Sequence, residues 1–121
     1  MSAKPGPRVH TMRLDRPYID RVASGVKTVE IRVLDKKRSG IRVGDLVVFA
    51  NGETELPMTV EAVNVYESFP DAYRAEDPAS INPSMSVNDQ IVGLREMYPP
   101  EREALGVVAL HLTDGNGARS G

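Results

Sequence analysis

Apolar and polar positions alternate along several segments of the chain, and this alternation predicts β-strands. Residues 9–14 alternate weakly, whereas residues 28–34 alternate strictly, with Val29, Ile31 and Val33 on one face. Valine-rich runs at residues 44–50, 56–66 and 107–112 have the composition of further strands, and Pro57 stands near the start of the second run. Strands therefore recur along the whole chain.

Helical spacing appears between these strands. Apolar residues at positions 18, 19, 22 and 23 follow an Asp15 cap and a proline, and the stripe stops at Gly25. Ser68 predicts the cap of a second helix, and Ser86 predicts the cap of a third. One face of the third helix is expected to carry Val87, Ile91, Leu94 and Met97.

The remaining segments are predicted to be loops, tails and one further helical turn. Residues 35–40 and 77–85 are polar and predict loops, and residues 98–106 predict a helical turn closed by Gly106. Tails rich in Gly, Pro and Ser are expected at residues 1–8 and 114–121, with one domain at residues 9–113. Strands separated by short helices favour an α+β fold, a small mixed β-barrel decorated by helices, with a flat sandwich as the alternative.

Composition excludes several classes of site. The chain has 121 residues, 40% hydrophobic and 26% charged, which is typical of one soluble globular domain. It has no cysteine, which excludes disulfides, thiolate zinc sites and a cysteine nucleophile. No apolar run approaches the roughly 20 residues of a membrane span. We therefore expect a cytoplasmic protein with no membrane partner, and a monomer.

The charges are distributed unevenly along the chain. The first 45 residues carry a formal charge of +6 and the remainder carries −8. A basic half is typical of a surface that binds an anion such as a phosphate backbone. Alternatively, the fold interleaves the two halves and the charges average out.

A charged triplet, Lys27, Glu30 and Arg32, stands on and just before the strictly alternating strand. On a strand, Glu30 and Arg32 share a face and lie about 6.6 Å apart, so they either pair with each other or converge on a ligand. Lys27, just after Gly25, can place its ammonium over the same face. A carboxylate and a guanidinium suit a base edge, and a lysine suits a phosphate. The alternative is a solvated strand face.

The sequence resembles the ASCH-domain family of the PUA-like superfamily. The family's G-x-K-x-x-E-x-R signature matches Gly25, Lys27, Glu30 and Arg32 without a gap, ahead of the strand entered through a Gly-Asp pair at residues 44 and 45. The resemblance extends over residues 9–112 and includes the tail pattern Tyr98, Glu101, Glu103 and Gly106.

The resemblance implies a PUA-like mixed β-barrel of about five to six strands in which the motif lines a cleft. It also implies binding of RNA or of a modified nucleoside. We therefore expect Lys27, Glu30 and Arg32 to border one concave pocket, with Lys27 at its rim. Gly25 belongs to the same nucleic-acid-binding segment.

The alternative function is that of a small hydrolase. Some relatives remove the acetyl group of N4-acetylcytidine with a threonine at the motif's glutamate position, whereas this chain has Glu30 there and Thr28 beside Lys27. Lys27 and Glu30 would then be the catalytic pair acting through water. Other relatives are metal-dependent ribonucleases. A ribonuclease activity in this chain would need Mg²⁺ held by Glu30 and an acid from residues 67–77. Apart from that alternative, we expect no cofactor.

A few residues outside the motif are further candidates. Lys37 and Arg38 either bind phosphate or are solvated loop residues. Tyr66 and Phe69 either stack on a base or pack in the core, and packing is the expectation for Phe69. Tyr98 is expected to pack, and His10 and His111, which lie on strands, carry no functional assignment.

Overall fold

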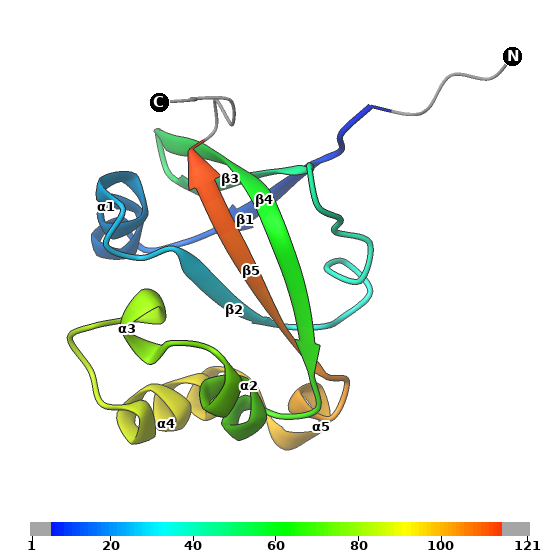
Figure 1. The fold of residues 1–121 in the computed structure, drawn as a ribbon, viewed down its shortest axis with the longest axis vertical. Helices are drawn as coiled ribbons and strands as arrows, with labels where there is room; N and C mark the ends of the chain where they lie inside the picture. The colour runs from blue at the N-terminus through cyan, green and yellow to red at the C-terminus, as the bar shows by residue number, and fades with distance from the viewer. Residues whose placement is uncertain (1–5, 115–121) are drawn as a thin grey trace, which may run out of the picture.

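The computed structural model describes residues 6–114, which form an α+β fold (Figure 1). The strands of this part are β1 (Val9–Arg13), β2 (Val29–Val33), β3 (Leu46–Asn51), β4 (Thr54–Tyr66) and β5 (Val107–Asp114). Its helices are α1 (Arg16–Ser24), α2 (Phe69–Ala75), α3 (Pro78–Ile81), α4 (Val87–Met97) and α5 (Pro100–Glu103). Residues 1–5 and 115–121 of the expected tails lie outside the described range. None of the described helices has the length and apolar character needed to cross a membrane.

The five described strands form one curled sheet in the order β1-β3-β4-β5-β2. β1 and β3 are parallel, and every other neighbouring pair is antiparallel. β1 and β2 are therefore the two edges of a half-open barrel. The predicted α+β class and the barrel-like curl are confirmed, and the flat sandwich is wrong.

The sheet separates two apolar clusters. One cluster gathers residues such as Met12, Val22 and Phe49 on the side of α1. The other includes Val29, Ile31 and Val33 of β2 packed with Phe69 and Tyr73 of α2. β2 alternates as predicted, but its whole length is buried, including Glu30 and Arg32. The solvated strand face is therefore wrong.

Most of the predicted helix ends are confirmed. The Ser68 and Ser86 hydroxyls accept hydrogen bonds from backbone N–H groups of α2 and α4, and α1 ends at Gly25. α1 begins after Asp15 as predicted, but the Asp15 side chain makes no capping hydrogen bond, so that part of the prediction is wrong. The expected loop at residues 77–85 is wrong in part, because α3 forms within it. The Asp77 carboxylate caps α3 by accepting the Ala79 N–H at 3.1 Å.

Two strand boundaries differ from the prediction. β3 begins two residues late, at Leu46, because Gly44 takes φ +95° in the preceding turn. β4 begins early, at Thr54, so Pro57 lies inside the strand. Proline is tolerated there because, within residues 6–114, β5 pairs with β4 from Met58 onward and Pro57 has a ladder partner on the β3 side alone.

Candidate functional site

A cavity of about 460 Å³ lies along the free edge of β2. We call it the edge cavity. α1 and the end of β1 form one of its walls, and α2, α3 and α4 form the other. Its lining comprises Arg13, Leu14, Asp15, Tyr18, Lys27, Glu30, Ile31, Arg32, Tyr73, Ile81, Asn82, Met85, Gln90, Gly93, Leu94, Met97 and Tyr98. The motif's lysine, glutamate and arginine thus border one concave pocket, together with residues far apart in the sequence.

The end of α1 places the motif lysine. Gly25 takes φ +84°, a left-handed conformation that favours glycine, and its N–H donates to the Val22 carbonyl. The Arg21 carbonyl accepts the N–H groups of Val26 and Lys27, at 2.9 and 3.0 Å. This closed turn directs the chain from α1 into β2. Gly25 therefore acts by shaping the backbone ahead of Lys27.

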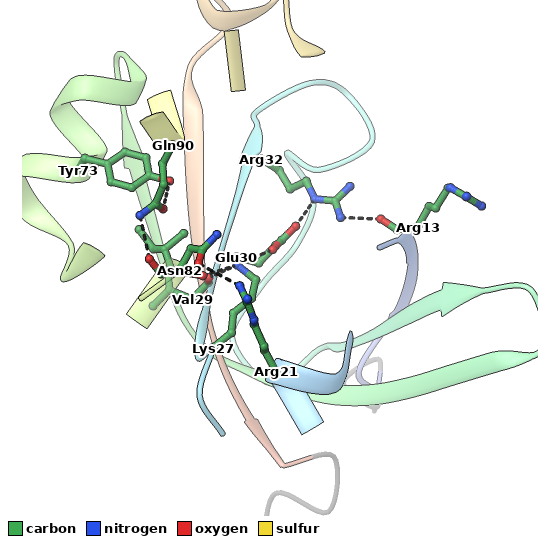
Figure 2. A network of polar contacts seen from close by, with 10 residues as sticks. Arg13, Arg21, Lys27, Val29, Glu30, Arg32, Tyr73, Asn82 and Gln90 are labelled. Atoms are coloured by element: carbon green, nitrogen blue, oxygen red, sulfur yellow. Dashed lines mark hydrogen bonds and ion pairs between the residues drawn. The ribbon is translucent and has the colours of Figure 1, made fainter. Parts of the chain in front are cut away.

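The Lys27 ammonium is buried, with the residue 5% exposed, and does not lie at the rim where we expected it. It donates to the carbonyls of Val29 and Ile81, at 2.9 and 3.1 Å, and forms an ion pair with Glu30 Oε1 at 3.0 Å (Figure 2). An ammonium group has three N–H donors, and these three contacts use all of them. Lys27 thus fastens α3 to the start of β2.

Arg32 connects the two edges of the sheet. Its Nε donates to Glu30 Oε2 at 2.6 Å, and its Nη2 donates to the Arg13 carbonyl, at the end of β1, at 2.7 Å. Figure 2 shows the resulting chain of contacts from Lys27 through Glu30 and Arg32 to Arg13. The guanidinium also interacts with the Tyr98 hydroxyl. Side chains, rather than a backbone ladder, therefore hold β1 and β2 together across the cavity.

The neighbouring charges set the ionisation of Glu30 and Arg32. Burial alone would raise the pKa of Glu30, but the adjacent Lys27 and Arg32 charges and their hydrogen bonds outweigh it and lower that pKa. Burial disfavours the charged form of Arg32, yet the Glu30 carboxylate raises its pKa overall. Burial, together with the Glu30 charge, raises the pKa of Tyr73. Glu30 is thus an ionised acceptor with low basicity.

The wall formed by α4 depends on one buried amide, that of Gln90, which is 6% exposed. Its Nε2 donates to the carbonyls of Asn82 and Met85, both at 2.9 Å, and its Oε1 accepts the Tyr73 hydroxyl at 2.9 Å. Gln90 therefore joins α2, the segment after α3 and α4. Two residues of the predicted apolar face of α4 are exposed rather than buried: Val87 is 37% exposed and Met97 is 68% exposed.

The opposite wall carries a stacked pair. The Arg21 guanidinium lies over the Tyr18 ring, 5.4 Å from its centroid, and its Nη1 donates to Asn82 Oδ1 at 3.0 Å. The Ser84 N–H donates to the same oxygen at 3.0 Å. Arg21 therefore links α1 to the segment after α3.

The basic loop lies outside the lining of the edge cavity. Arg38 Nη1 donates to Asp35 at 2.7 Å, and Arg102 of α5 donates to the same carboxylate at 3.0 Å. These bonds hold the loop against α5, and Lys37 is exposed. Lys37 and Arg38 thus form a separate surface.

Tyr66 is also away from the edge cavity. Its hydroxyl donates to Glu76 Oε2 at 2.5 Å, and Asn64 Nδ2 donates to the same oxygen at 2.9 Å. His111 Nε2 lies 2.7 Å from Glu76 Oε1. Burial, reinforced by the Glu76 charge, raises the pKa of Tyr66 to about 12, and the three neighbours outweigh burial to lower the pKa of Glu76. This cluster ties α2 to β4 and β5.

The acids of residues 67–77 do not meet Glu30. Asp71 pairs with Arg74, Glu76 accepts the hydrogen bonds just described, and Asp77 caps α3. Within residues 6–114, no three His, Asp or Glu side chains gather as a metal-binding group would require.

Sequence reasoning missed most of the lining, including Tyr18, Tyr73, Asn82 and Gln90. One signal was available for Gln90, because positions 87, 90, 91 and 94 form a single helical stripe. A polar residue within such a stripe indicates a buried hydrogen-bonding role. Asn82 and Tyr73 carry no comparable local signal, since long-range packing alone brings them to the cavity.

Comparisons with known proteins agree with the fold and the motif. The family model for the ASCH domain matches residues 12–115. The crystal structure of the hypothetical protein PH0355 has a TM-score of 0.80 and 32% sequence identity, covering 86% of this chain and 96% of that one. The solution structure of PF0455 from Pyrococcus furiosus has a TM-score of 0.71 and 30% identity, covering 86% and 94%. No curated protein matches the chain. The resemblance carried by the G-x-K-x-x-E-x-R motif is confirmed: the chain belongs to the ASCH domain family.

Proposed function

We propose that this ASCH domain binds single-stranded RNA by accepting one unstacked nucleotide into the edge cavity. Membership of the family supports an RNA-binding role at the level of the family. The observation that supports this location is the cavity itself, with about 460 Å³ and a largely apolar lining that includes Tyr18, Tyr73 and Tyr98. Small-ligand sites have this character, and single-stranded RNA is commonly held by stacking its bases on aromatic rings.

In this proposal the charged triplet shapes the cavity. Lys27 and Arg32 form hydrogen bonds with Glu30 and with carbonyls of β1, β2 and α3, and Arg32 also interacts with the Tyr98 hydroxyl. They hold the two walls at a fixed separation, so the pocket exists before the ligand arrives. A preformed pocket avoids the free energy of ordering its walls on binding.

In this proposal, cationic side chains more exposed than Lys27 and Arg32 contact the phosphate. The Arg13 side chain is exposed at the end of β1 and borders the cavity. A nucleotide whose base enters the cavity would place its phosphate at the mouth, within reach of Arg13. Lys37 and Arg38 remain candidates for a more distant part of the RNA backbone.

The hydrolase alternative is less favoured by this geometry. Lys27 has its three donors engaged, so stabilising an oxyanion would require it to leave one of its partners. Glu30 has a lowered pKa and accepts from a cation at each oxygen, which makes it a weak general base.

The test is fluorescence anisotropy with short labelled single-stranded RNAs of each base, at several salt concentrations. Tyr18→Ala is expected to weaken binding roughly 5- to 150-fold, because one base-stacking contact is worth about 1–3 kcal/mol. Arg13→Ala is expected to reduce the salt slope by about 0.7, as one lost phosphate contact would.

Lys37→Ala is the matched control, since Lys37 is exposed and lies outside the cavity lining. If Lys37→Ala alone weakened RNA binding, the RNA interface would lie on the basic loop and not at the edge cavity. No binding by the parent protein to any of the RNAs at low salt would reject the proposed function.

A further inference from the structure

The free edge of β2 presents backbone groups to the edge cavity. β2 ends the strand order and pairs on one side alone, with β5. In an antiparallel pair, alternate residues direct both their N–H and C=O toward the partner, and the residues between them direct both groups away. The phase of this alternation decides which peptide groups face the cavity.

Two hydrogen bonds at the ends of β2 set the phase. Leu112 N–H donates to the Thr28 carbonyl at 2.9 Å, and Leu34 N–H donates to the Gly106 carbonyl at 2.8 Å. The register is continuous between them, so the even-numbered residues of β2 face β5. Val29, Ile31 and Val33 therefore direct their N–H and C=O groups away from the sheet.

Neighbouring groups already occupy the carbonyls at both ends of this edge. Lys27 Nζ donates to the Val29 carbonyl at 2.9 Å, and the Asp35 N–H donates to the Val33 carbonyl at 2.9 Å. Ile31 lies between them, and it is the one of the three outward-facing residues that borders the edge cavity. Its side chain packs in the cluster with Phe69, and the phase of the ladder directs its N–H and C=O toward the free edge along which the cavity lies.

We propose that the Ile31 N–H and C=O bind the Watson–Crick edge of the nucleobase in the edge cavity, as an adjacent donor and acceptor. This inference rests on the proposed function and names the group that recognises the base. Unpaired bases are commonly read on that edge, where each of the four carries a donor next to an acceptor. Asn82 also borders the cavity, and its Nδ2 supplies a further donor, because the described side-chain contacts of Asn82 use Oδ1 and Gln90 bonds to its backbone carbonyl.

The geometry favours a compact planar ligand over an added peptide strand. Strand addition depends on a row of backbone hydrogen bonds along an edge. Here the carbonyls on either side of Ile31 are taken, and α1, α3 and α4 close the cavity around it. One donor and one acceptor inside about 460 Å³ suit a single base.

The first arm of the test compares ligands. The parent protein is titrated with the four nucleoside 5′-monophosphates, and the tightest binder is compared with its edge-methylated form: 3-methyluridine, N3-methylcytidine, N1-methylguanosine or N1-methyladenosine monophosphate. We expect edge methylation to weaken binding about tenfold or more, because it removes a donor or acceptor and leaves Ile31 unpaired. The 2′-O-methyl form is the control for a methyl group away from the base.

The second arm changes the backbone. Ile31→Pro removes the N–H, and proline is accepted on an edge strand where the N–H points away from the ladder. Ile31→Ala also shortens the side chain but keeps the backbone N–H. The ratio of the nucleotide affinities of Ile31→Pro and Ile31→Ala therefore measures the contribution of the Ile31 N–H. We expect Ile31→Pro to bind about tenfold or more weakly than Ile31→Ala.

Nuclear magnetic resonance of the parent protein gives a third arm of the test that does not require Ile31→Pro to fold. In the labelled parent protein, the Ile31 amide resonance should move downfield with the unmodified nucleotide and stay in place with the edge-methylated form. Equal affinity for the two nucleotides, or an Ile31 amide that does not move while others do, would overturn the inference and leave RNA binding intact. No binding by the parent to any nucleotide or RNA would reject the proposed function, and the inference with it.

Discussion

Replacing Glu30 by glutamine removes the anion that two buried cations share. Glu30 is 5% exposed, and its carboxylate lies 3.0 Å from Lys27 Nζ and 2.6 Å from Arg32 Nε. Removing one partner from a buried ion pair typically costs about 3–5 kcal/mol, because the remaining charge stays desolvated. For a domain of this size, such a loss of unfolding free energy lowers Tm by about 10–20 °C.

The assay is thermal and urea unfolding at neutral pH, followed by circular dichroism. Asp20→Asn is the control, since Asp20 pairs with Arg16 at 4.0 Å on an exposed surface and should change stability by less than about 1 kcal/mol. Glu30→Gln combined with Lys27→Met should lose less than the sum of the single losses, because the two groups interact directly. A loss below about 1 kcal/mol for Glu30→Gln would refute the view that the triplet holds the cavity walls.

The pH dependence gives a second readout of the same site. The pKa of Glu30 is lowered in the folded protein from an ordinary value of 4.5, so its contribution is fully present above that value. That contribution is lost as the pH falls below 4.5 and through the lower folded pKa. The stability difference between the parent and Glu30→Gln should therefore shrink as the pH falls through this range. A difference that stays constant down to the acid unfolding of the parent would contradict the lowered pKa.

Other substitutions test the backbone and the second polar cluster. Gly25→Ala should lose about 1 kcal/mol of unfolding free energy, because residue 25 has φ +84°. Gly93→Ala should gain up to about 1 kcal/mol, because Gly93 lies within α4 and alanine favours a helix. Urea unfolding measures both changes, and a gain for Gly25→Ala would contradict the left-handed turn. Tyr66→Phe should lose about 1–3 kcal/mol by leaving Glu76 short of a buried donor, as measured by thermal unfolding. Absorbance titration of the parent should then show a tyrosine with a pKa of about 12 that is missing from Tyr66→Phe; an unchanged titration curve would assign that pKa to another ring.

Short-range chemistry determined the elements of this protein. Asp15 and Gly25 delimit α1, Ser68 and Ser86 cap α2 and α4, and the period-two pattern places Glu30 and Arg32 on one face of β2. These features depend on groups within a few residues of one another, so the sequence alone was enough to predict them. The one-turn helix α3 escaped prediction because four residues carry too little periodic signal.

Tertiary structure decided how these elements form a site. The partners of Lys27 and Arg32 include carbonyls 54 and 19 residues away, at Ile81 and Arg13, and no local pattern reveals such contacts. The same holds for Gln90, whose amide is buried because α4 packs against α2 and the segment after α3. The outward-facing peptide of Ile31 depends on β2 being an edge strand, which follows from its pairing with β5 nearly 80 residues later in the chain. Strand order and register arise from burying apolar surface over long sequence separations, so only the folded chain determines which peptide groups remain free for a ligand.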